Sequence, residues 1–393
     1  MMIVNNVPLW SVTTWDKKYN AVDKTWQPQT IKYKYLLSDE LDKISVKDGN
    51  VRLLYTGKDI GYTTETLAGD ALSEGEIVAI PWGGTPSVKY FKGKFVTGDN
   101  RIATSNNPEE LLNKYLYYYL LGNLNELSSY YRGAGLKHPS MKDVLKMRIS
   151  YPSVEVQKRI IKQFDLLLDI VEMRKLQLQQ LDELVKARFV EMFGDPETNP
   201  YGWEQITVGD VCSSIVRGPF GSALKKEFFV EPDETTYKVY EQKHAIQKSA
   251  TIGTYYVTAE KFNELKRFEC VAGDILMSCS GTMGELYQLP IGCEKGLINQ
   301  ALCKFTLNDK ILPIVFLTYM KQTIGNLETK GSGIQNIAAV SYVKAMPINL
   351  PPLNVQTQFV TFVEQVDKSK FAVQKALDEA QTLFDSLMQE YFG

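Results

Sequence analysis

The residues best suited to chemistry in this chain are hydrogen-bond donors that stand beside glycine. Residues 217–226 combine an arginine, two glycines and a lysine pair. Glycine lets the backbone approach a phosphate, while arginine, lysine and serine can donate to phosphate oxygens or base edges. This pattern favours nucleic-acid contact, and a Gly-Pro turn with a solvated lysine pair is the alternative. The candidates here are Arg217, Gly218, Phe220, Gly221, Ser222, Lys225 and Lys226.

Other polar segments in the second half of the chain could also read base edges. An amide such as Gln242 can pair with adenine, and small hydroxyls can pair with several bases. The open alternatives are an exposed strand around Gln242 and ordinary turn chemistry around Ser280. The candidates are Gln242, Lys243, His244, Ser280, Thr282 and Asn299.

The first half of the chain carries a comparable set. A glycine turn begins at Trp82, lysines alternate with aromatic residues over 89–95, and a second glycine turn spans 132–138. Basic side chains on such a strand could reach phosphates, although a half-buried strand and a structural turn fit as well. The candidates are Trp82, Gly83, Gly84, Thr85, Lys89, Lys92, Arg101, Arg132, Lys137 and His138.

One pattern raises the alternative of a restriction endonuclease. Asp233 follows a proline, and Glu241 and Lys243 stand a few residues later, which imitates the Pro-Asp…Glu-x-Lys site that holds Mg²⁺ in many nucleases. The spacing is short and Asp233 lies in an acidic turn. A methyltransferase is disfavoured because the chain lacks a glycine-rich cofactor loop, and a motor because it lacks a phosphate-binding loop. The sequence therefore predicts no catalytic residue, no cofactor and no metal.

Composition narrows the possible classes further. The net charge is −2, so contact with DNA would depend on local basic clusters or on a basic partner. The five cysteines form no C-x-x-C pair, which favours reduced thiols in a cytoplasmic protein over disulfides or a zinc site. Two histidines are too few for a histidine-rich metal centre. No apolar run reaches the ~20 residues of a membrane span, and the first ten residues do not resemble a signal peptide.

An internal repeat must position these candidates. Residues 147–194 align without a gap on residues 346–393, at a constant offset of 199 positions. Shared features include the order Ile-x-x-Pro, Val-Gln and Glu-x-Phe-Gly. Upstream, residues 75–77 resemble residues 273–275, and the turn at Trp82 corresponds to the turn at Ser280. The chain is therefore two copies of one plan, each a variable region followed by a well-matched segment.

The matched segments predict two long helices. From Val154 to Met192 apolar residues recur at steps of three and four, and the second copy repeats this spacing. Such a helix would be about 58 Å long, and its exposed stripe favours antiparallel pairing of the two helices, with unrelated surface helices as the alternative. Charged residues interrupt the stripe at Arg174, Lys175 and Lys370. The predicted packing residues are Phe164, Val171, Leu178, Leu181, Val185, Val363, Val366, Val373, Leu377 and Phe384.

The variable regions have the pattern of mixed α/β structure. Alternating apolar runs between glycine and asparagine turns predict strands, and longer apolar runs predict helices. Strands are predicted at 76–82, 94–97, 254–257 and 274–278, and helices at 109–127 and 312–324.

This organisation resembles the specificity subunits of type I restriction-modification systems over essentially the whole chain. The resemblance is carried by the two extended-proline helix entries, the helix end, and two motifs of the second domain. These segments are Ile149–Pro152 with Gln157, Ile348–Pro352 with Gln356, Glu191–Gly194, Tyr201–Val211 and Val271–Leu276. The resemblance implies an α/β (α+β) fold in which two globular target-recognition domains are separated by two long antiparallel helices in a coiled coil, as an internal pseudo-twofold repeat. The expected boundaries are 1–146, 147–194, 195–345 and 346–393.

The resemblance also implies a function and partners. Each target-recognition domain would read one half of a split site in double-stranded DNA, and the helices would act as the spacer. Two adenine methyltransferase subunits and a motor-nuclease subunit would supply methylation and restriction, without a membrane. A pure assembly scaffold is a third hypothesis, which the near-neutral charge favours and the two large, diverged domains disfavour.

Overall fold

A computed structural model describes residues 3–17, 32–57, 60–195, 198–220, 222–329 and 339–393. The chain divides into two compact units. The first unit comprises Met1–Lys175 and Lys375–Gly393, and the second comprises Leu176–Gln374. Each unit therefore contains one globular region and one half of each long helix, whereas the boundaries expected from the sequence treat the helices as separate segments.

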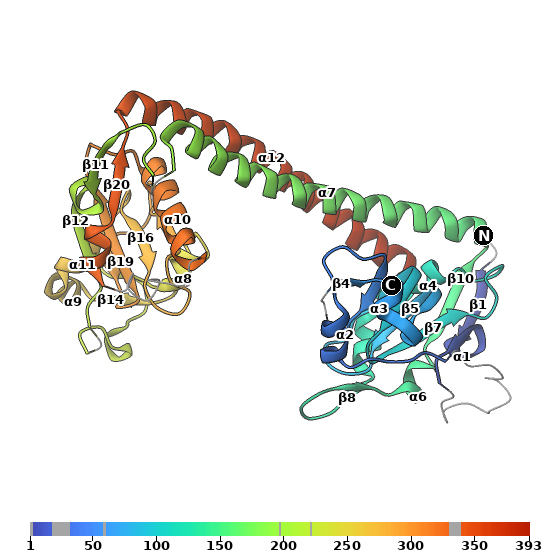
Figure 1. Cartoon of the computed structure of the whole chain (residues 1–393). Coiled ribbons are helices and arrows are strands. Elements are labelled where there is room, and N and C mark those ends of the chain that lie inside the picture. The colour runs from blue at the N-terminus through green and yellow to red at the C-terminus, as the bar shows by residue number, and fades with distance from the viewer. Residues whose placement is uncertain (1–2, 18–31, 58–59, 196–197, 221, 330–338) are drawn as a thin grey trace. The chain divides into compact units, whose positions relative to one another are not determined.

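The first unit is built on a mixed six-stranded sheet (Figure 1). Its strands, in spatial order, are β2 (Thr13–Trp15), β7 (Asn100–Ser105), β5 (Ser73–Pro81), β6 (Lys89–Thr97), β3 (Val51–Leu54) and β4 (Ile60–Thr63). All neighbours pair antiparallel except β3 and β6, which are parallel. Helix α4 (Asn113–Gly122) packs on this sheet with an aromatic core that includes Trp15, Tyr115 and Tyr118.

The second unit has two four-stranded sheets. The first sheet contains, in spatial order, β12 (Cys212–Arg217), β19 (Leu302–Leu307), β16 (Ile275–Ser278) and β17 (Leu286–Gln288). The second contains β14 (Tyr256–Val257), β13 (Tyr237–Tyr240), β18 (Gly296–Ile298) and β15 (Glu269–Cys270). Helix α10 (Pro313–Thr329) takes the place that α4 has in the first unit, and α8 (Gln242–Ile246) follows β13.

The internal repeat is confirmed by strand order and by matching hydrogen bonds. The order β2-β7-β5-β6 is reproduced by β12-β19-β16-β17. A two-stranded antiparallel ribbon also recurs, as β1 (Ile3–Pro8) with β10 (Arg148–Pro152) and as β11 (Glu204–Thr207) with β20 (Pro347–Leu350). The Leu9 amide donates to the Met147 carbonyl at 2.8 Å, and Val208 donates to Met346 at the same distance. Both pairs are 199 positions apart, so the repeat begins well upstream of the segments that sequence similarity aligns.

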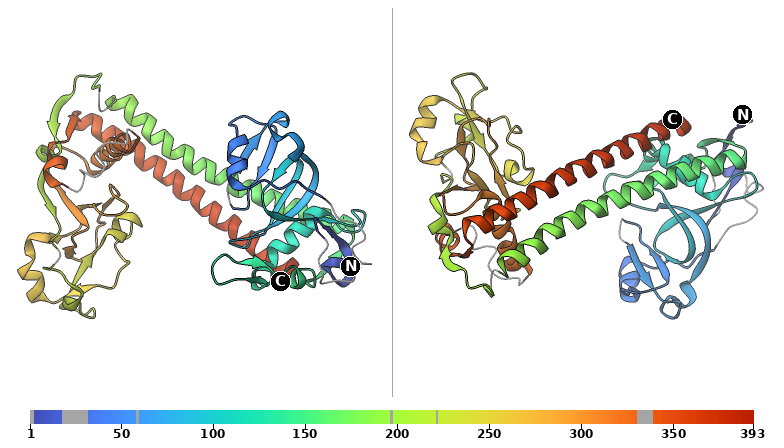
Figure 2. Two further views of the ribbon diagram at one scale, coloured as in Figure 1. Left: turned by 60° about the horizontal axis from the view of Figure 1, so that its bottom comes forward. Right: turned by 90° about the horizontal axis from the view of Figure 1, so that it is seen from above.

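The two long helices are α7 (Val154–Phe193) and α12 (Leu353–Phe392), of 40 residues each. They run antiparallel, so the first half of α7 lies beside the last half of α12 within the first unit, and the remaining halves pair within the second (Figure 2). The ring centroids of Phe164 and Phe384 are 5.3 Å apart in the first pairing, and those of Phe189 and Phe359 are 5.5 Å apart in the second. The predicted antiparallel pairing is confirmed.

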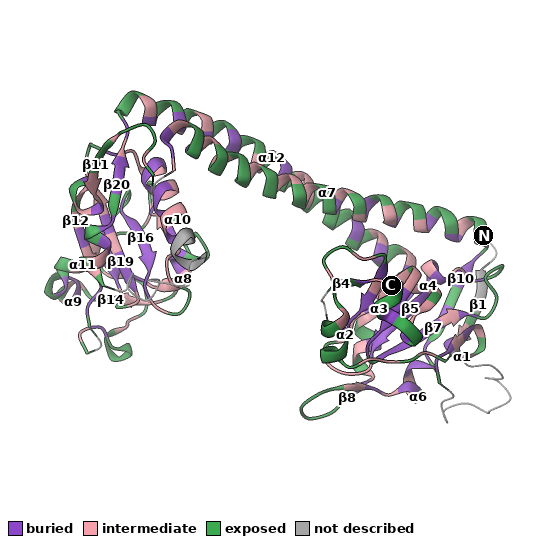
Figure 3. Cartoon of the chain, in the orientation of Figure 1, coloured by how far each residue is buried: buried purple, intermediate pink, exposed green. Residues whose placement is uncertain are grey.

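The predicted packing stripe faces inward along both helices (Figure 3). None of its ten residues is exposed. Four are half-buried, namely Leu178, Leu181, Val185 and Leu377, and the other six are buried: Phe164, Val171, Val363, Val366, Val373 and Phe384. Lys370, which interrupts the stripe, forms an ion pair with Asp182 of α7 at 2.7 Å.

Two buried glutamines join the globular regions to the starts of the long helices. The Gln157 amide accepts from the Leu112 N–H at 2.9 Å and donates to the carbonyls of Glu110 and Pro152 at 2.7 and 2.8 Å. Gln356 repeats this arrangement with the Leu312 N–H at 2.8 Å and two backbone carbonyls at 3.0 and 2.9 Å. Both side chains are fully buried. Each amide therefore satisfies three backbone groups that would otherwise be unpaired at the helix entry.

The remaining elements are short. They are α1 (Leu9–Val12), α2 (Ser38–Ile44), α3 (Glu65–Ala68), α5 (Leu124–Ser129), β8 (Tyr131–Arg132), β9 (His138–Pro139), α6 (Met141–Val144), α9 (Ala259–Glu264) and α11 (Val340–Ala345). The helix predicted over 109–127 is two helices, α4 and α5, because the chain turns at Asn123, and the strand predicted over 254–257 is only two residues long. Among the described helices, none has the length and apolar character that crossing a membrane requires.

We expect Gln157→Ala to lower the free energy of unfolding by roughly 2–3 kcal/mol, because it removes the partner of one backbone N–H and two backbone carbonyls at the helix entry. Gln179→Ala, at an exposed position of the same helix, should change it by less than about 0.5 kcal/mol. Urea unfolding followed by circular dichroism measures both. Equal stability of the two variants would contradict the structural role of the Gln157 amide.

Candidate nucleic-acid interface

The second unit brings four separate segments together at one end of the sheet β12-β19-β16-β17. Arg217, at the end of β12, donates from Nε to the Gln300 carbonyl and from Nη2 to the Cys279 carbonyl, both at 3.3 Å. The Gln242 amide donates to the carbonyl of Ser280 and, at 3.4 Å, to that of Thr282. We call Arg217, Gln242, Ser280, Thr282 and Asn299 the second-unit loop cluster. The sequence nominated all five residues without indicating that they meet.

A glycine anchors the loop that follows Arg217. A Cβ atom on Gly218 would lie 1.8 Å from the Asn299 carbonyl oxygen, so only glycine fits, and the Gly218 N–H donates to the Leu302 carbonyl at 2.9 Å. Phe220 follows two positions later and is 88% exposed. The fixed backbone at Gly218 therefore presents a solvent-exposed aromatic ring beside the loop cluster.

The other predicted residues of this loop are less closely tied to the cluster. Ser222, Lys225 and Lys226 are exposed, and no hydrogen bond or ion pair within the described residues connects them to it. Gly221 lies outside the described residues. The two lysines are free to contact a polyanion, which suits phosphate binding better than base reading.

His244 lies inside the second unit. Its Nδ1 accepts the Glu241 N–H at 2.8 Å, and its Nε2 lies 2.7 Å from the Ile252 carbonyl, to which it donates as a neutral ring. Burial lowers the pKa of His244. The ring therefore holds the first turn of α8, which carries Gln242, and as placed it is covered from any ligand. Lys243 is half-buried and forms an ion pair with Glu241 at 2.6 Å.

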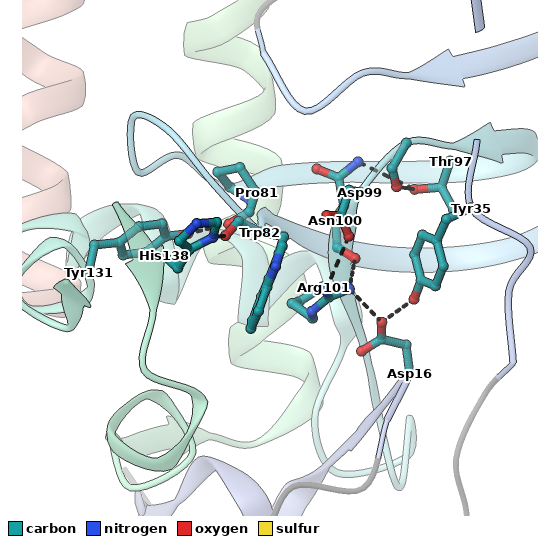
Figure 4. A network of polar contacts seen from close by, with 11 residues as sticks. Asp16, Tyr35, Pro81, Trp82, Thr97, Asp99, Asn100, Arg101, Tyr131 and His138 are labelled. Carbon is teal, nitrogen blue, oxygen red and sulfur yellow. Dashed lines mark hydrogen bonds and ion pairs between the residues drawn. The ribbon is translucent and has the colours of Figure 1, made fainter. Parts of the chain in front are cut away.

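In the first unit the predicted glycine turn is held from two sides (Figure 4). His138 Nδ1 lies 2.7 Å from the Trp82 carbonyl, and the Gly84 N–H donates to the Lys137 carbonyl at 3.0 Å. Gly84 has a φ of 98°, a conformation that favours glycine. On the other side of the indole, the Arg101 guanidinium lies 4.0 Å from the Trp82 ring centroid. The turn at 82–85 thus brings Arg101, Lys137 and His138 together around Trp82 and Gly84, and Thr85 is exposed at its tip.

Arg101 is an internal anchor of this turn. It is 2% exposed and forms ion pairs with Asp16 at 3.5 Å and Asp99 at 3.1 Å. The Tyr35 hydroxyl donates to Asp16, and burial together with Asp16 raises the pKa of Tyr35. Arg101 was nominated for direct contact, but its guanidinium lies beneath the surface and supports the Trp82 ring.

The remaining basic residues of the first unit differ in availability. Lys89 donates to three successive backbone carbonyls, including that of Gly57 at 2.7 Å, so it closes a loop. Lys92 and Arg132 are exposed and form ion pairs with Glu76 at 3.4 Å and Asp143 at 2.9 Å. Exposed ion pairs of this kind contribute little stability, so both side chains can exchange their partner for a phosphate. Lys137 is also exposed.

The two glycine turns occupy equivalent places in the repeat. The Trp82 N–H donates to the Asp99 carbonyl at 3.0 Å just before β7, and the Cys279 N–H donates to the Ala301 carbonyl at 2.7 Å just before β19. The sequence-based pairing of the Trp82 turn with the Ser280 turn agrees with this register. Sequence reasoning missed Asp16 and Tyr35, because nothing in their neighbourhood along the chain indicates that they meet Arg101.

The nuclease pattern gains no support from the structure. The Asp233 carboxylate accepts from the Thr235 N–H at 2.7 Å and from its hydroxyl at 2.8 Å, which closes a turn, and Glu241 is paired with Lys243. Within the described part of the chain, no three His, Cys, Asp or Glu side chains are grouped so that they could hold a metal ion. All five cysteines are free.

Comparisons with known proteins agree with this architecture. A family model described as type I restriction modification DNA specificity domain matches the chain twice, over residues 30–183 and 200–380. The type I restriction enzyme EcoDI specificity subunit of Escherichia coli is 27% identical over 109 residues, which cover 28% of this chain and 24% of that protein. The chain thus matches about a quarter of the length of that curated relative.

Two solved structures share the fold. The type I restriction-modification S subunit from M. genitalium gives a TM-score of 0.56 at 15% identity, covering 99% of this chain and 96% of that one. A chain from a study of complex assembly and conformational transition of the type I R-M system gives 0.54 at 16% identity, covering 90% and 93%. At these identities the likeness concerns the fold.

We expect Arg101→Met to destabilise the first unit by roughly 3–5 kcal/mol, because it leaves the buried Asp16 carboxylate without its cation. Lys92→Met, at an exposed ion pair, should cost less than about 1 kcal/mol. Thermal and urea unfolding of the full chain measure both changes. If Arg101→Met is as stable as Lys92→Met, Arg101 does not anchor the turn.

His244 should make the second unit sensitive to acid. Because its pKa is lowered on folding, the folded chain binds fewer protons than the unfolded chain near the ordinary histidine pKa of about 6.5. The stabilisation from the neutral ring is present above that value and is lost as the pH falls through it. Between pH 7.5 and 5.5 the Tm of the wild type should therefore fall by more than that of His244→Gln. An equal fall in both proteins would show that His244 is solvated.

Proposed function

Because the chain belongs to the family of type I restriction modification DNA specificity domains, we propose that it is the non-catalytic DNA-reading subunit of a type I restriction-modification complex. Each unit reads one half of a bipartite target in double-stranded DNA. The observation that carries this proposal is the duplicated sheet with an equivalent glycine turn in both units, since two copies of one scaffold with different loop residues can read two different half-sequences.

The second-unit loop cluster is the proposed base-reading surface of that unit. Arg217 offers donors that suit guanine, and Gln242 offers an amide that suits adenine. Both already donate to backbone carbonyls, so these bonds fix their positions before DNA arrives. Lys225 and Lys226 supply phosphate contacts in this unit, and Lys92, Arg132 and Lys137 do so in the first. A net charge of −2 makes such local clusters necessary.

The paired helices are the proposed spacer. A 40-residue helix is about 60 Å long, which exceeds one turn of DNA at ~34 Å. The antiparallel pairing resists bending of either helix, so the separation of the half-sites would be set by helix length.

Chemistry is assigned to partner subunits. We propose that two adenine methyltransferase subunits and a motor-nuclease subunit assemble with this chain, and that the specificity of both methylation and restriction comes from it. The cytoplasm is the proposed compartment, and the five free cysteines suit its reducing conditions.

Genome-wide mapping of N6-methyladenine tests this function. A host that expresses the chain with its methyltransferase partner should carry marks at a bipartite sequence with a fixed spacer, and these marks should vanish when the chain is deleted. Marks at continuous sequences only would contradict the bipartite reading. Asp233→Asn should leave restriction unchanged, whereas loss of metal-dependent cleavage by the isolated chain would favour the nuclease hypothesis.

Replacing residues 195–345 with the equivalent region of another specificity subunit should change one half-site and leave the other half-site and the spacer intact. Insertion of one heptad between Leu178 and Leu184 should widen the spacer or abolish methylation, because only the helix is lengthened. The same methylation mapping measures both effects. A swap that alters both half-sites would contradict independent reading by the two units.

A further inference from the structure

The second unit contains an open groove between α10 and the paired halves of α7 and α12. Its volume is about 740 Å³, within the ~300–1,000 Å³ range of pockets that bind ligands. Val185, Thr318 and Val363 contribute one wall residue from each of the three helices. None of the residues that we propose to contact DNA lines this groove.

The repeat identifies the residues of the first unit that occupy the equivalent positions. The offset of 199 pairs Val363 with Phe164 and Val185 with Phe384. The Leu112 and Leu312 amides both donate to the glutamine at a helix entry, which aligns α4 with α10 and pairs Thr318 with Tyr118. These three of the groove's lining residues, one from each helix, therefore correspond to aromatic residues of the first unit.

In the first unit these three rings fill the space. The centroids of Tyr118 and Phe164 are 4.9 Å apart, and those of Phe164 and Phe384 are 5.3 Å apart. All three side chains are buried or nearly so, and the Tyr118 hydroxyl donates to Asp165 at 2.6 Å. In the second unit the smaller side chains of Val185, Thr318 and Val363 do not fill the equivalent space, and the groove remains open. The groove is thus a site shaped for aromatic rings that this copy of the repeat does not supply.

Two polar side chains at the groove, Gln322 and Lys321, could bind an oxygen acceptor from a partner. The Gln322 Nε2 is buried and has no hydrogen-bond partner among the described residues. Lys370 is already paired with Asp182 at 2.7 Å. Burial, with the charges of Lys248 and Lys370, lowers the pKa of Lys321. A carboxylate beside the entering ring would offer Gln322 an acceptor and Lys321 an anion.

A second hollow adjoins the groove and indicates that the occupant is a protein. Asp367 lines both, and the neighbouring hollow is also lined by Phe371, which is 75% exposed. A small molecule in the groove would leave this phenylalanine in water, whereas a protein segment that crosses Asp367 covers both hollows. Exposed aromatic residues beside a pocket are typical of protein interfaces.

We propose that this groove receives an aromatic side chain, next to a carboxylate, from the methyltransferase subunit. The inference rests on the proposed function for the identity of the partner. Because the first unit fills the equivalent space with its own rings, this contact exists in one copy of the repeat, and the two methyltransferase subunits are held differently.

Grafting the rings of the first unit into the groove tests the proposal. The full chain with Val185→Phe, Thr318→Tyr and Val363→Phe should keep or raise its Tm and should bind the purified methyltransferase subunit at least tenfold more weakly. Leu184→Phe is the matched control, because it adds a ring at an exposed position next to Val185 that does not line the groove. This control should bind as the wild type does. Affinity can be measured by fluorescence anisotropy with a labelled methyltransferase subunit.

A charge variant keeps the test decisive if the triple variant does not fold. Lys321→Glu should also weaken binding at least tenfold, and its folding is checked by circular dichroism. Wild-type affinity in a folded triple variant or in Lys321→Glu would overturn the groove proposal alone. Failure of the wild-type chain to bind any methyltransferase subunit would instead overturn the proposed function.

Discussion

The structure depends on the junction between each globular region and its long helix, where one buried amide satisfies three backbone groups. Gln157 and Gln356 each tie the start of a helix to the loop that leads into α4 or α10. An amide has both a donor and an acceptor, so it can bind an N–H and carbonyls together, which no aliphatic or acidic residue of that size could do. The same bond pattern in both copies links each globular region to the start of its long helix through one side chain. The globular region of each unit is therefore held in place relative to the start of its long helix.

The repeat and the two long helices could be predicted from the sequence, because both produce a regular spacing of residues along the chain. The offset of 199 and the three-and-four apolar pattern indicated α7 and α12 nearly to the residue, and the inward face was predicted correctly. The equivalence of the Trp82 and Ser280 turns was also visible. The order of the strands was not, because strand pairing is decided by contacts between distant segments, such as β2 with β7.

The candidate site was predictable by residue type but not by role. Arg101 and His244 carry the groups expected of DNA-contacting residues, and burial turns one into the support of Trp82 and the other into the support of α8. The sequence does not reveal whether a basic side chain faces solvent or a buried carboxylate. Arg101 is buried against Asp16, which lies 85 positions away in the sequence. The convergence of Arg217 with Gln300 is likewise a product of the sheet.

The aromatic end of α12 bears on how the protein is made. Phe384 and Phe392 lie in the core of the first unit, and the Phe392 ring is 5.4 Å from that of Tyr115. Residues 375–393 leave the ribosome only after the entire second unit has been synthesised, so the first unit has an unfilled apolar core throughout that interval. Nascent chains with exposed apolar surface are prone to aggregate. The core of the first unit can therefore be completed only after residues 375–393 have been synthesised, which is after the second unit.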